Sequence, residues 1–494
     1  MWFTQLVERN RQCHPHRTAV ADARRSVTWA EFHDRTAQLA HGFAALGIDR
    51  GDRVAILSQD RIEVLESYFA LARIGALFVP LNHSLSAPEA TEIIERVGAV
   101  AVVGETELLD RHPELPASVR LRVALDQPVF EALGTEAPEP RPALPDVADT
   151  DPVAVLHTSA TTGRAKGVTV DAASFRAIAL GWLVSARPTD DMVMVNCCPL
   201  YHGSMVVSLT YMAAGTTIVL MPGFTPQRAV AAVERHRATH MWMVPQMVRF
   251  MLQAKASRTA NLGSLREILY GAAPMPPEVY TEAVERLGCG FRQVYGMTEV
   301  GGPFVTLGPE EHPAPGQVDA RIPCGRVVPG MSARAVDDAG REVPGGEIGE
   351  IVVRGPGVMQ GYWNEPDATA EITLDGWIRT GDLGFFDGQG RIHLVDRSKD
   401  LIIRAGQNVY PSEIERVLTQ HPAVLDAAVV GTPDDDYGEV PLAYVVATEG
   451  TTAADLLAHA RENLAPYKRP TRFEFLAQVP RNPAGKIVKK LLRA

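Results

Sequence analysis

The 494-residue sequence predicts an α/β fold, because apolar segments of strand length alternate with amphipathic segments of helical spacing. Strands that are apolar throughout and separated by helices favour βαβ units with a parallel sheet. The chain is too long for one ordinary hydrophobic core, so we expect two or more domains. Hydrophobic residues make up 46% of the chain and charged residues 22%, which is typical of a folded globular protein.

The first of these elements is a helix that begins with a capping box. Thr28 and Glu31 form that box, apolar residues follow at helical spacing, and Gly47 and Gly51 end the helix. The elements expected next are the strand 53–57, the helix 62–74, the strand 77–80, the helix 88–97 and the strand 99–103.

The alternation resumes after a proline-rich stretch at 137–145, which predicts an exposed linker. Residues 204–221 carry no charge and reach the length of a membrane span, but small residues around Gly215 divide them. The elements expected here are a short helix after 204, a strand at 218–221, a helix that Thr225 and Pro226 open and that runs to about 237, and a strand at 240–244.

The C-terminal part of the chain has a different character. Residues 319–396 have glycine or proline turns at short intervals and no long helix, which predicts a small β-subdomain. A compact α+β part follows, in which Ser412 and Glu415 predict a helix cap. Its expected elements are the helix 412–420, the strands 425–430 and 442–448, the helix 453–464 and a final helix 487–492.

The charge and cysteine content narrow the possible partners. Lysine and arginine number 48 and aspartate and glutamate 59, a net charge of −11 without a long basic run, so we expect no nucleic-acid binding. The five cysteines lack CxxC spacing, which favours reduced thiols in a cytoplasmic protein over a zinc site. No secretion signal is recognisable at the N-terminus, and we expect no membrane insertion.

A loop at 157–168 gathers hydroxyls, glycines and a lysine directly after an apolar strand. Backbone N–H groups and the lysine of such a loop can bind an anion. The spacing of a Walker A motif is absent, which excludes a P-loop nucleoside triphosphatase. An ordinary surface loop remains the alternative. The candidate phosphate-binding residues are Thr158, Ser159, Thr161, Thr162, Gly163 and Lys166.

Further segments carry groups that suit a nucleotide. The small residues of 270–274 would let a flat ring lie against the backbone. In the segment 295–299, Tyr295 can stack on a base, the Thr298 hydroxyl can donate to a phosphate, and the Glu299 carboxylate can hold Mg²⁺. Asp382 can accept hydrogen bonds from ribose hydroxyls. Taken singly, the segments 270–274 and 380–382 are more typical of a structural turn, and the segment 295–299 is not specific to nucleotide binding.

In their order along the chain, these segments resemble the motifs of the adenylate-forming superfamily, which includes acyl-CoA synthetases, firefly luciferase and peptide-synthetase adenylation domains. Residues 396–415 resemble its hinge and thioester segment over twenty contiguous positions. Residues 480–490 resemble its C-terminal lysine motif, in which Lys486 is preferred over Lys489 and Lys490 because it follows a turn. The departures are Ala160 and Ala405, where the family has glycine, and Ala165, where it has proline.

The resemblance implies an architecture. We expect a large N-terminal adenylation domain, residues 1–396, with two βαβ-type sheets and the β-subdomain at 319–396. A hinge at 397–400 would connect it to a small mobile α+β C-terminal domain, residues 401–494.

The resemblance also implies the roles of individual residues. Lys486, Thr298 and His202 would be catalytic, and Glu299 would bind the metal. Nucleotide and coenzyme contacts would come from the phosphate loop and from Gly271, Ala272, Ala273, Tyr295, Asp382, Arg397 and Gly406, with Lys399 as the hinge residue.

The implied reaction activates a carboxylic acid with ATP and Mg²⁺ as an acyl-AMP and transfers the acyl group to coenzyme A. The segment 199–204 resembles the acyl-pocket segment of coumarate- and fatty-acid-type CoA ligases, and it lacks the aspartate that would favour an amino acid substrate. Three alternatives stay open: loading of a carrier protein, activation of a small anion such as nitrite for N–N bond formation, and an ATP- or acyl-binding protein that has lost turnover. We expect a cytoplasmic monomer or homodimer. An apolar lining of the acyl pocket is expected from Trp242, Met243, Met247, Met297 and Val300.

Overall fold

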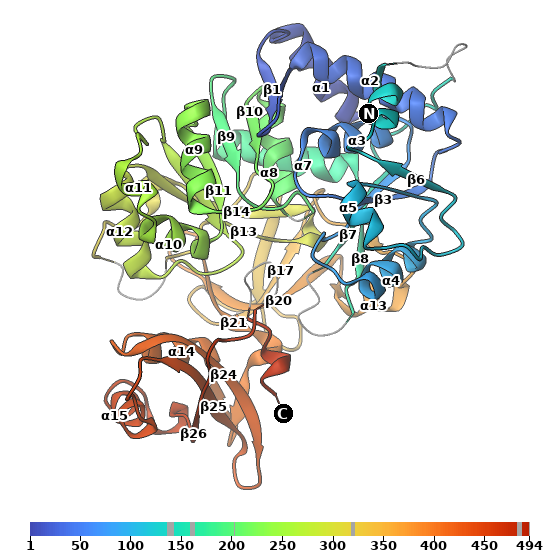
Figure 1. The fold of residues 1–494 in the computed structure, drawn as a ribbon. Helices are drawn as coiled ribbons and strands as arrows, with labels where there is room; N and C mark the ends of the chain where they lie inside the picture. Colours follow the sequence, from blue (N-terminus) through green and yellow to red (C-terminus); the bar gives the residue numbers. More distant parts are fainter. Residues whose placement is uncertain (136–142, 159–163, 202, 318–321, 482–486, 494) are drawn as a thin grey trace. The chain divides into compact units, whose positions relative to one another are not determined.

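In the computed structural model the chain forms two compact units (Figure 1). The first unit contains Met1–Thr158, Ala165–Ser332 and Arg354–Thr373, and the second includes Ala333–Val353 and Leu374–Ala494. The predicted α/β class, with a large N-terminal part and a small C-terminal part, is confirmed. The structure describes residues 1–135, 143–158, 164–201, 203–317, 322–481 and 487–493.

The first unit contains two mainly parallel sheets. In sheet A the strand order is β15-β14-β13-β12-β11-β9-β10-β1-β2, and the strands from β13 to β1 in this order are parallel. These strands are β1 (Thr18–Ala21), β2 (Ser26–Thr28), β9 (Val193–Asn196), β10 (Thr217–Leu220), β11 (His240–Met243), β12 (Glu267–Gly271), β13 (Gly290–Met297), β14 (Gly302–Leu307) and β15 (Arg326–Val327). The helices that follow strands of sheet A are α8 (Gly203–Ala213), α9 (Pro226–His236), α10 (Pro245–Gln253), α11 (Ala256–Thr259) and α12 (Pro277–Leu287).

In sheet B the strand order is β18-β8-β7-β4-β3-β5-β6, and only β8 and β18 run antiparallel to their neighbours. These strands are β3 (Arg53–Leu57), β4 (Leu77–Pro80), β5 (Ala101–Gly104), β6 (Leu121–Ala124), β7 (Pro152–His157), β8 (Gly167–Asp171) and β18 (Gly361–Tyr362). The accompanying helices are α1 (Trp2–Cys13), α2 (Trp29–Ala45), α3 (Ile62–Arg73), α4 (Ala87–Val97), α5 (Thr106–Asp110), α6 (Pro128–Thr135) and α7 (Ala172–Ser185).

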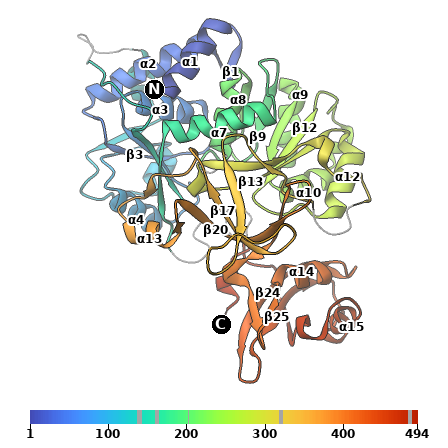
Figure 2. The ribbon, with the colours of Figure 1, turned by 180° about the vertical axis from the view of Figure 1, so that it is seen from behind.

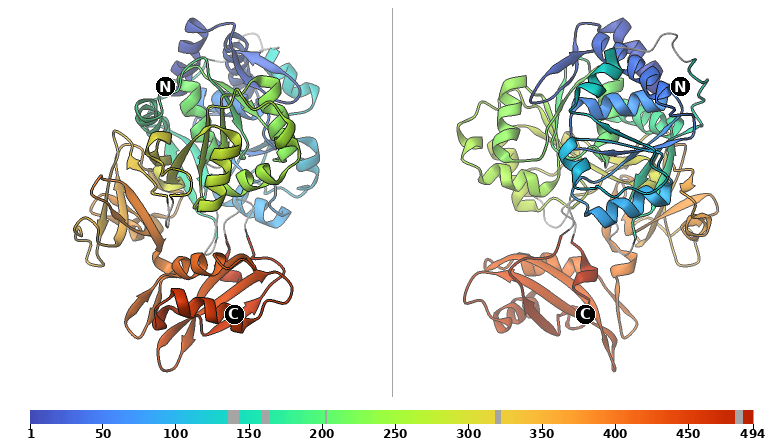
Figure 3. Two further views of the ribbon diagram at one scale, coloured as in Figure 1. Left: turned by 90° about the vertical axis from the view of Figure 1, so that its left-hand side faces the viewer. Right: turned by 45° about the vertical axis from the view of Figure 1, so that its right-hand side comes forward.

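Helices cover both faces of sheet B, as a parallel sheet requires (Figure 3). In β4, Leu77 and Val79 join the core beneath α4, whereas Phe78 points to the other face and stacks on Tyr68 of α3 at 4.5 Å between ring centroids. The predicted capping box of α2 is present, since the Thr28 side chain accepts from the Glu31 backbone N–H. The strands and helices expected between 53 and 103 are confirmed, with ends shifted by two residues or fewer.

Helices α7 and α8 lie side by side in the first unit, and α7 contacts both β8 of sheet B and β14 of sheet A (Figure 2). Gly215, with φ of +87°, separates α8 from β10, so the uncharged stretch is divided as expected. Residues 204–212 of α8 are all buried, which explains why the stretch has no charge. Among the residues that the structure describes, none of the helices has the length and apolar character needed to cross a membrane.

The second unit contains two smaller sheets. Sheet C has the order β16-β17-β20-β19, with β21 paired to β20, and sheet D has the order β23-β22-β25-β24, with β26 paired to β25. Their strands are β16 (Ser332–Val336), β17 (Gly349–Arg354), β19 (Thr373–Leu374), β20 (Trp377–Phe386), β21 (Ile392–Arg397), β22 (Ile402–Arg404), β23 (Gln407–Val409), β24 (Val424–Asp434), β25 (Gly438–Ala447) and β26 (Arg472–Phe475). Within 319–396, β15 and β18 pair with sheets A and B, and a short helix α13 (Pro366–Glu371) follows β18.

Sheet D has helices on one face and the C-terminal segment on the other, and alternate residues of β24 point to opposite faces. Ala427 and Val429 join the core under α14 (Pro411–Thr419) and α15 (Ala453–Asn463), whereas Ala428 and Val430 pack with Leu492 from the C-terminal segment. The expected helices 412–420 and 453–464 and the expected strands 425–430 and 442–448 are thus confirmed, with ends that differ by up to four residues.

Two local predictions in the second unit are wrong. Ser412 does not cap α14, because its hydroxyl donates to the Val395 carbonyl at 2.6 Å and the helix begins at Pro411. The final helix 487–492 is replaced by an isolated bridge between Arg481 and Ile487 and a single 3-10 turn over Lys489–Leu491. The backbone N–H of residue 488 donates to the Pro480 carbonyl, which withdraws it from a helix.

Candidate functional site

The base of the phosphate loop is closed by hydrogen bonds between the residues that flank it. The Thr158 N–H donates to the Lys166 carbonyl at 3.0 Å, and the Lys166 N–H donates to the Thr158 hydroxyl at 3.1 Å. Ala165 stands where the adenylate-forming superfamily has proline, and its carbonyl accepts a hydrogen bond from the Arg96 guanidinium. The other predicted residues Ser159, Ala160, Thr161, Thr162 and Gly163, together with His202 and Lys486, lie outside the described residues.

Lys166 and Glu299, predicted for the phosphates and the metal, both contact Tyr362. The Lys166 ammonium lies 4.7 Å from the centroid of the Tyr362 ring, and the Tyr362 hydroxyl donates to Glu299 Oε1 at 2.8 Å. Burial and then the Glu299 carboxylate raise the pKa of the Tyr362 hydroxyl, so that it stays a donor at neutral pH. Sequence reasoning missed Tyr362, because it lies in the two-residue strand β18 and no motif used here includes it.

The surroundings of Glu299 fit a magnesium ion. Its residue is 9% exposed, and among the described residues no lysine, arginine or histidine lies within 4.0 Å of its carboxylate. Buried carboxylates are normally paired with a cation. Mg²⁺ is often held by one carboxylate together with phosphate oxygens and water, so the single carboxylate of Glu299 is a sufficient protein ligand for it.

The motif around Tyr295 is shaped by a close backbone approach. A Cβ on Gly296 would lie 2.3 Å from the Gly302 carbonyl oxygen, so only glycine fits between β13 and β14. The half-buried Tyr295 ring contacts Phe304 at 5.2 Å between centroids. Thr298 opens the 3-10 turn η1 (Thr298–Val300) that carries Glu299.

At the end of β12, a position where only glycine fits is followed by a residue with an unfavourable backbone conformation. A Cβ on Gly271 would lie 2.4 Å from the Val294 carbonyl oxygen, which excludes any side chain. Ala272 is exposed and has φ of +66°, a left-handed conformation that is unfavourable for alanine. Ala273 is half-buried. Strained residues of this kind cluster at ligand sites.

In the second unit, the two residues predicted to contact ribose are bonded to each other. Asp382 and Arg397 are partners in the β20–β21 register, and Arg397 Nε lies 2.9 Å from Asp382 Oδ1. Asp382 is buried, and its N–H donates to the Thr380 hydroxyl at 3.1 Å. The pair gives a carboxylate and a guanidinium at adjacent positions of one sheet.

The predicted hinge residue Lys399 lies in the 3-10 turn η3 (Ser398–Asp400). Burial and then the nearby Arg397 charge lower the pKa of Lys399. Arg493 donates to the Asp400 carboxylate at 2.9 Å and so ties the C-terminal segment to this turn.

Gly406 and Ala405 form the two-residue turn between β22 and β23, with φ of +77° and +49°. Both positions are left-handed, which explains why glycine is favoured at each and makes Ala405 a strained departure.

The tail lysines differ in their surroundings. Lys489 Nζ lies 2.8 Å from Glu415 Oε1 and is a structural ion pair, whereas Lys490 is exposed. Arg481 donates twice to the Asp426 carboxylate, at 3.0 and 2.8 Å. These pairs fix the two ends of the segment that contains Lys486.

The acyl-pocket segment contacts a buried carboxylate that the sequence did not suggest. The Leu200 N–H donates to Asp60 Oδ1 at 2.9 Å, and burial raises the pKa of Asp60 to about 7. Asp60 follows β3 and Leu200 follows β9, so this bond joins the carboxyl ends of strands from both sheets. Of the expected apolar lining, Met243 and Val300 are fully buried, and Met247 and Met297 are half-buried. The buried Trp242 indole N–H has no hydrogen-bond partner in the part of the chain that the structure describes.

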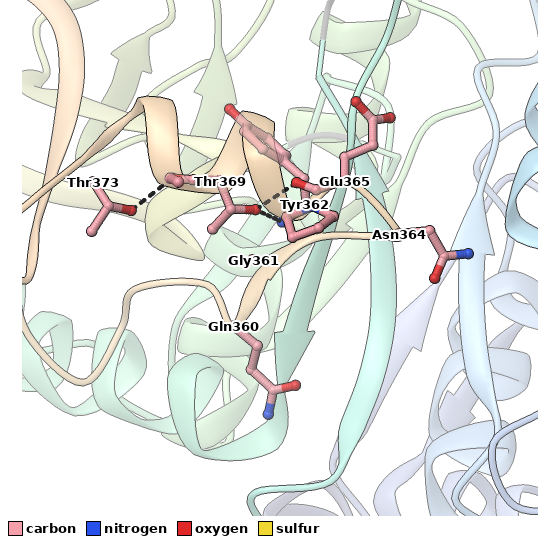
Figure 4. Close-up of a pocket in the computed structure, with 9 residues that line it drawn as sticks. Gln360, Gly361, Tyr362, Asn364, Glu365, Thr369 and Thr373 are labelled. Atoms are coloured by element: carbon pink, nitrogen blue, oxygen red, sulfur yellow. Dashed lines mark hydrogen bonds between the residues drawn. The ribbon is translucent and has the colours of Figure 1, made fainter.

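An open pocket of about 620 Å³ lies along β18 and α13 (Figure 4). None of its lining residues was predicted as a site residue, but Tyr362 among them contacts the predicted residues Glu299 and Lys166. The lining consists of Gln360, Gly361, Tyr362, Asn364, Glu365, Pro366, Thr369, Ala370 and Thr373.

Comparison with known proteins gives matches over nearly the whole chain. Residues 7–363 match the family of the AMP-binding enzyme, and residues 413–486 match the AMP-binding enzyme C-terminal domain. The chain is 36% identical to the fatty acid–[acyl-carrier-protein] ligase ScoC of Streptomyces coeruleorubidus, over 99% of this chain and 96% of that one. It is 37% identical to a feruloyl-CoA synthase of Amycolatopsis sp, over 98% and 97%.

The fold is also similar to a solved structure, the O-succinylbenzoate coenzyme A synthetase (MenE) of Bacillus subtilis in complex with ATP and a magnesium ion. The TM-score is 0.87 at 30% identity, and the match covers 99% of this chain and 98% of that one.

Proposed function

The chain belongs to the family of AMP-binding enzymes, and we propose that it joins a carboxylic acid to the thiol of coenzyme A with cleavage of ATP to AMP. The predicted resemblance to adenylate-forming enzymes and the predicted enzyme class, an AMP-forming acid–thiol ligase, are confirmed by the relatives. We also propose the roles of the individual residues and the limits of the domains.

The reaction needs two steps because a carboxylate is a poor acyl donor. A carboxylate oxygen attacks the α-phosphorus of ATP, which forms the acyl-AMP and releases pyrophosphate. The thiolate of coenzyme A then attacks the acyl carbon and releases AMP. The first step joins two anions, so the enzyme must act mainly by positioning them and by neutralising charge.

The observation that carries the proposal is the buried Glu299 carboxylate with no cation among its described neighbours, connected through Tyr362 to the Lys166 ammonium. Glu299 would hold Mg²⁺, which when bound neutralises charge on the phosphates. Lys166 and the phosphate loop would hold the pyrophosphate end of ATP. Thr298, which starts the same 3-10 turn as Glu299, would donate to the α-phosphate.

The remaining roles follow the family pattern. Gly271, Ala272, Ala273 and Tyr295 would contact the adenine ring, and the Asp382–Arg397 pair suits the ribose hydroxyls and the α-phosphate. Lys486 would stabilise the transition state of adenylation, and His202 would line the acyl pocket. We propose a hinge at 397–400, between an adenylation domain at 1–396 and a mobile domain at 401–494, that would bring Gly406 to the pantetheine arm.

A carrier protein is the second candidate acceptor, and the similarity to a fatty acid–[acyl-carrier-protein] ligase favours it. AMP release with an activated acid separates the two acceptors: dependence on free coenzyme A supports the proposal, and dependence on a holo-carrier protein alone overturns it. We also propose a cytoplasmic location, because the five cysteines all lie among the described residues and form no disulfide bond.

The decisive experiment is pyrophosphate release over a panel of aliphatic and aromatic carboxylates, with nitrite as a further arm. We expect release with at least one carboxylate, and loss of release by orders of magnitude in Lys486→Ala with ATP binding retained. Release with nitrite alone, or ATP binding without release for every acid, would contradict the proposal.

A further inference from the structure

We propose that Tyr362 is a positioning residue that holds Glu299 ready for the metal ion and Lys166 ready for the phosphates of ATP. This inference rests on the proposed function and adds a residue to it. Tyr362 lies 63 positions from Glu299 in the chain, and its side chain contacts both predicted groups.

The hydroxyl of Tyr362 orients the carboxylate. It donates to Oε1 of Glu299 at 2.8 Å, and a donor at one carboxylate oxygen leaves the other oxygen for a cation. Partners that hydrogen-bond a metal ligand fix its rotamer and raise metal affinity. Glu299 is further fixed through its backbone, since its carbonyl accepts from the Met359 N–H at 2.9 Å.

The ring of Tyr362 holds the lysine without neutralising it. The Lys166 ammonium lies 4.7 Å from the ring centroid, and among the described residues no carboxylate lies within 4.0 Å of it. A cation–π contact is weaker than a contact with phosphate, so the ammonium can be transferred to an anion that enters.

The backbone of Tyr362 is held on two sides, which makes the side chain a rigid support. β18 pairs with β8, where the Trp363 N–H donates to the Gly167 carbonyl at 2.7 Å. On the other side the Tyr362 N–H donates to the Thr369 hydroxyl of α13 at 2.9 Å (Figure 4). Because β8 begins at the residue after Lys166, one pair of strands sets the distance between the lysine and the tyrosine ring.

Two substitutions separate the effect of the Tyr362 hydroxyl from the effect of its ring. Tyr362→Phe removes the hydrogen bond to Glu299 and keeps the ring beneath Lys166, whereas Tyr362→Leu removes both. Tyr280→Phe is the matched control, because the Tyr280 hydroxyl donates to the Pro313 carbonyl at 3.0 Å and touches no predicted site residue.

The first measurement is Mn²⁺ binding, followed by electron paramagnetic resonance in the presence of α,β-methylene-ATP, so that no turnover is required. We expect Tyr362→Phe to weaken Mn²⁺ binding by about 10- to 100-fold, the usual effect of losing a partner of a metal ligand. In ATP–pyrophosphate exchange at saturating Mg²⁺, its KM for ATP should stay near the wild-type value. Tyr362→Leu should raise that KM as well, because Lys166 loses its support.

The outcomes distinguish this inference from the proposed function. Wild-type exchange activity with unchanged Mn²⁺ binding in Tyr362→Phe overturns the role of Tyr362 alone. Equal weakening in Tyr280→Phe assigns the effect to general stability and overturns it as well. A wild-type protein that binds Mn²⁺ and the analogue but never exchanges pyrophosphate contradicts the proposed function instead.

Discussion

Replacement of Asp60 by asparagine should stabilise the protein, and more strongly at high pH than at low pH. The Asp60 carboxylate is buried, accepts a hydrogen bond from the Leu200 N–H and has no cationic partner among the described residues. Its surroundings include the ionisable groups of Tyr68, Cys198 and Tyr201, whose pKa values are raised in part by the Asp60 charge. Asparagine keeps an acceptor oxygen for Leu200 and removes the titration.

The magnitude follows from the two pKa values of Asp60. Burial raises the pKa from 3.8 to about 7 in the folded protein. Between these values the unfolded chain has released the proton that the folded protein still binds, so stability falls as pH rises and stays low above pH 7. Above pH 7 the Asp60 charge lowers the free energy of unfolding by about 4 kcal/mol, at 1.36 kcal/mol for each unit by which the pKa is raised. Between pH 5 and pH 8 the gain from Asp60→Asn should therefore grow by about 3 kcal/mol.

Urea unfolding followed by tryptophan fluorescence measures this difference. Every tryptophan except Trp377 lies in the same unit as Asp60, so the signal reports mainly on that unit. Asp146→Asn is the control, because Asp146 is an exposed aspartate in the same unit as Asp60. The reasoning is refuted if Asp60→Asn gives the same change in the free energy of unfolding at pH 5 and at pH 8.

Three further perturbations test other local features. Ala405→Gly should relieve the left-handed strain at φ of +49° and raise the free energy of unfolding of the second unit by about 0.5 kcal/mol, whereas a loss would show that alanine fits this turn. Gly271→Ala should lower the thermal midpoint and pyrophosphate release, because its Cβ would lie 2.4 Å from a backbone oxygen, whereas Gly388→Ala, with open space around its Cβ, should change neither. His157 is buried, neither of its ring nitrogens has a hydrogen-bond partner among the described residues, and burial, followed by the Arg96 charge, lowers its pKa to about 3. Below pH 6.5 the unfolded chain binds a proton that the folded protein does not, so stability falls as pH falls. The stabilisation that His157→Met gives in urea unfolding should therefore be about 2 kcal/mol larger at pH 5 than at pH 7.5. An equal change in the free energy of unfolding at the two pH values would contradict this prediction.

The features predicted correctly from the sequence are those that neighbouring residues encode. The α2 capping box, the alternating strands and helices between 53 and 103, and the break at Gly215 each depend on a few adjacent side chains. The wrong features depend on distant partners. The final helix is replaced because residues 480 and 481 pair with residues 487 and 488, and Ser412 is occupied by the Val395 carbonyl.

Tyr362 was missed for the same physical reason. Its strand is only two residues long, and its importance arises from contacts with Glu299 and Lys166, which are far away in the sequence. Motifs indicated the groups that act on a nucleotide, but the side chain between them became visible only when β18 was seen to pair with β8.

Asp60 and Glu299 are both buried carboxylates without a cationic partner among the described residues, yet they should respond in opposite ways to loss of charge. Each follows a strand of a parallel sheet, where ligands bind in folds of this kind. Under the proposed function, Mg²⁺ offsets the charge of Glu299 once ATP is bound, so Glu299→Gln should weaken Mn²⁺ binding. Asp60 contacts a backbone N–H of the acyl-pocket segment, and no predicted cation lies beside it, so its neutral variant should gain stability without losing metal affinity. The pair thus separates a charge that is buried for function from one that only reduces stability.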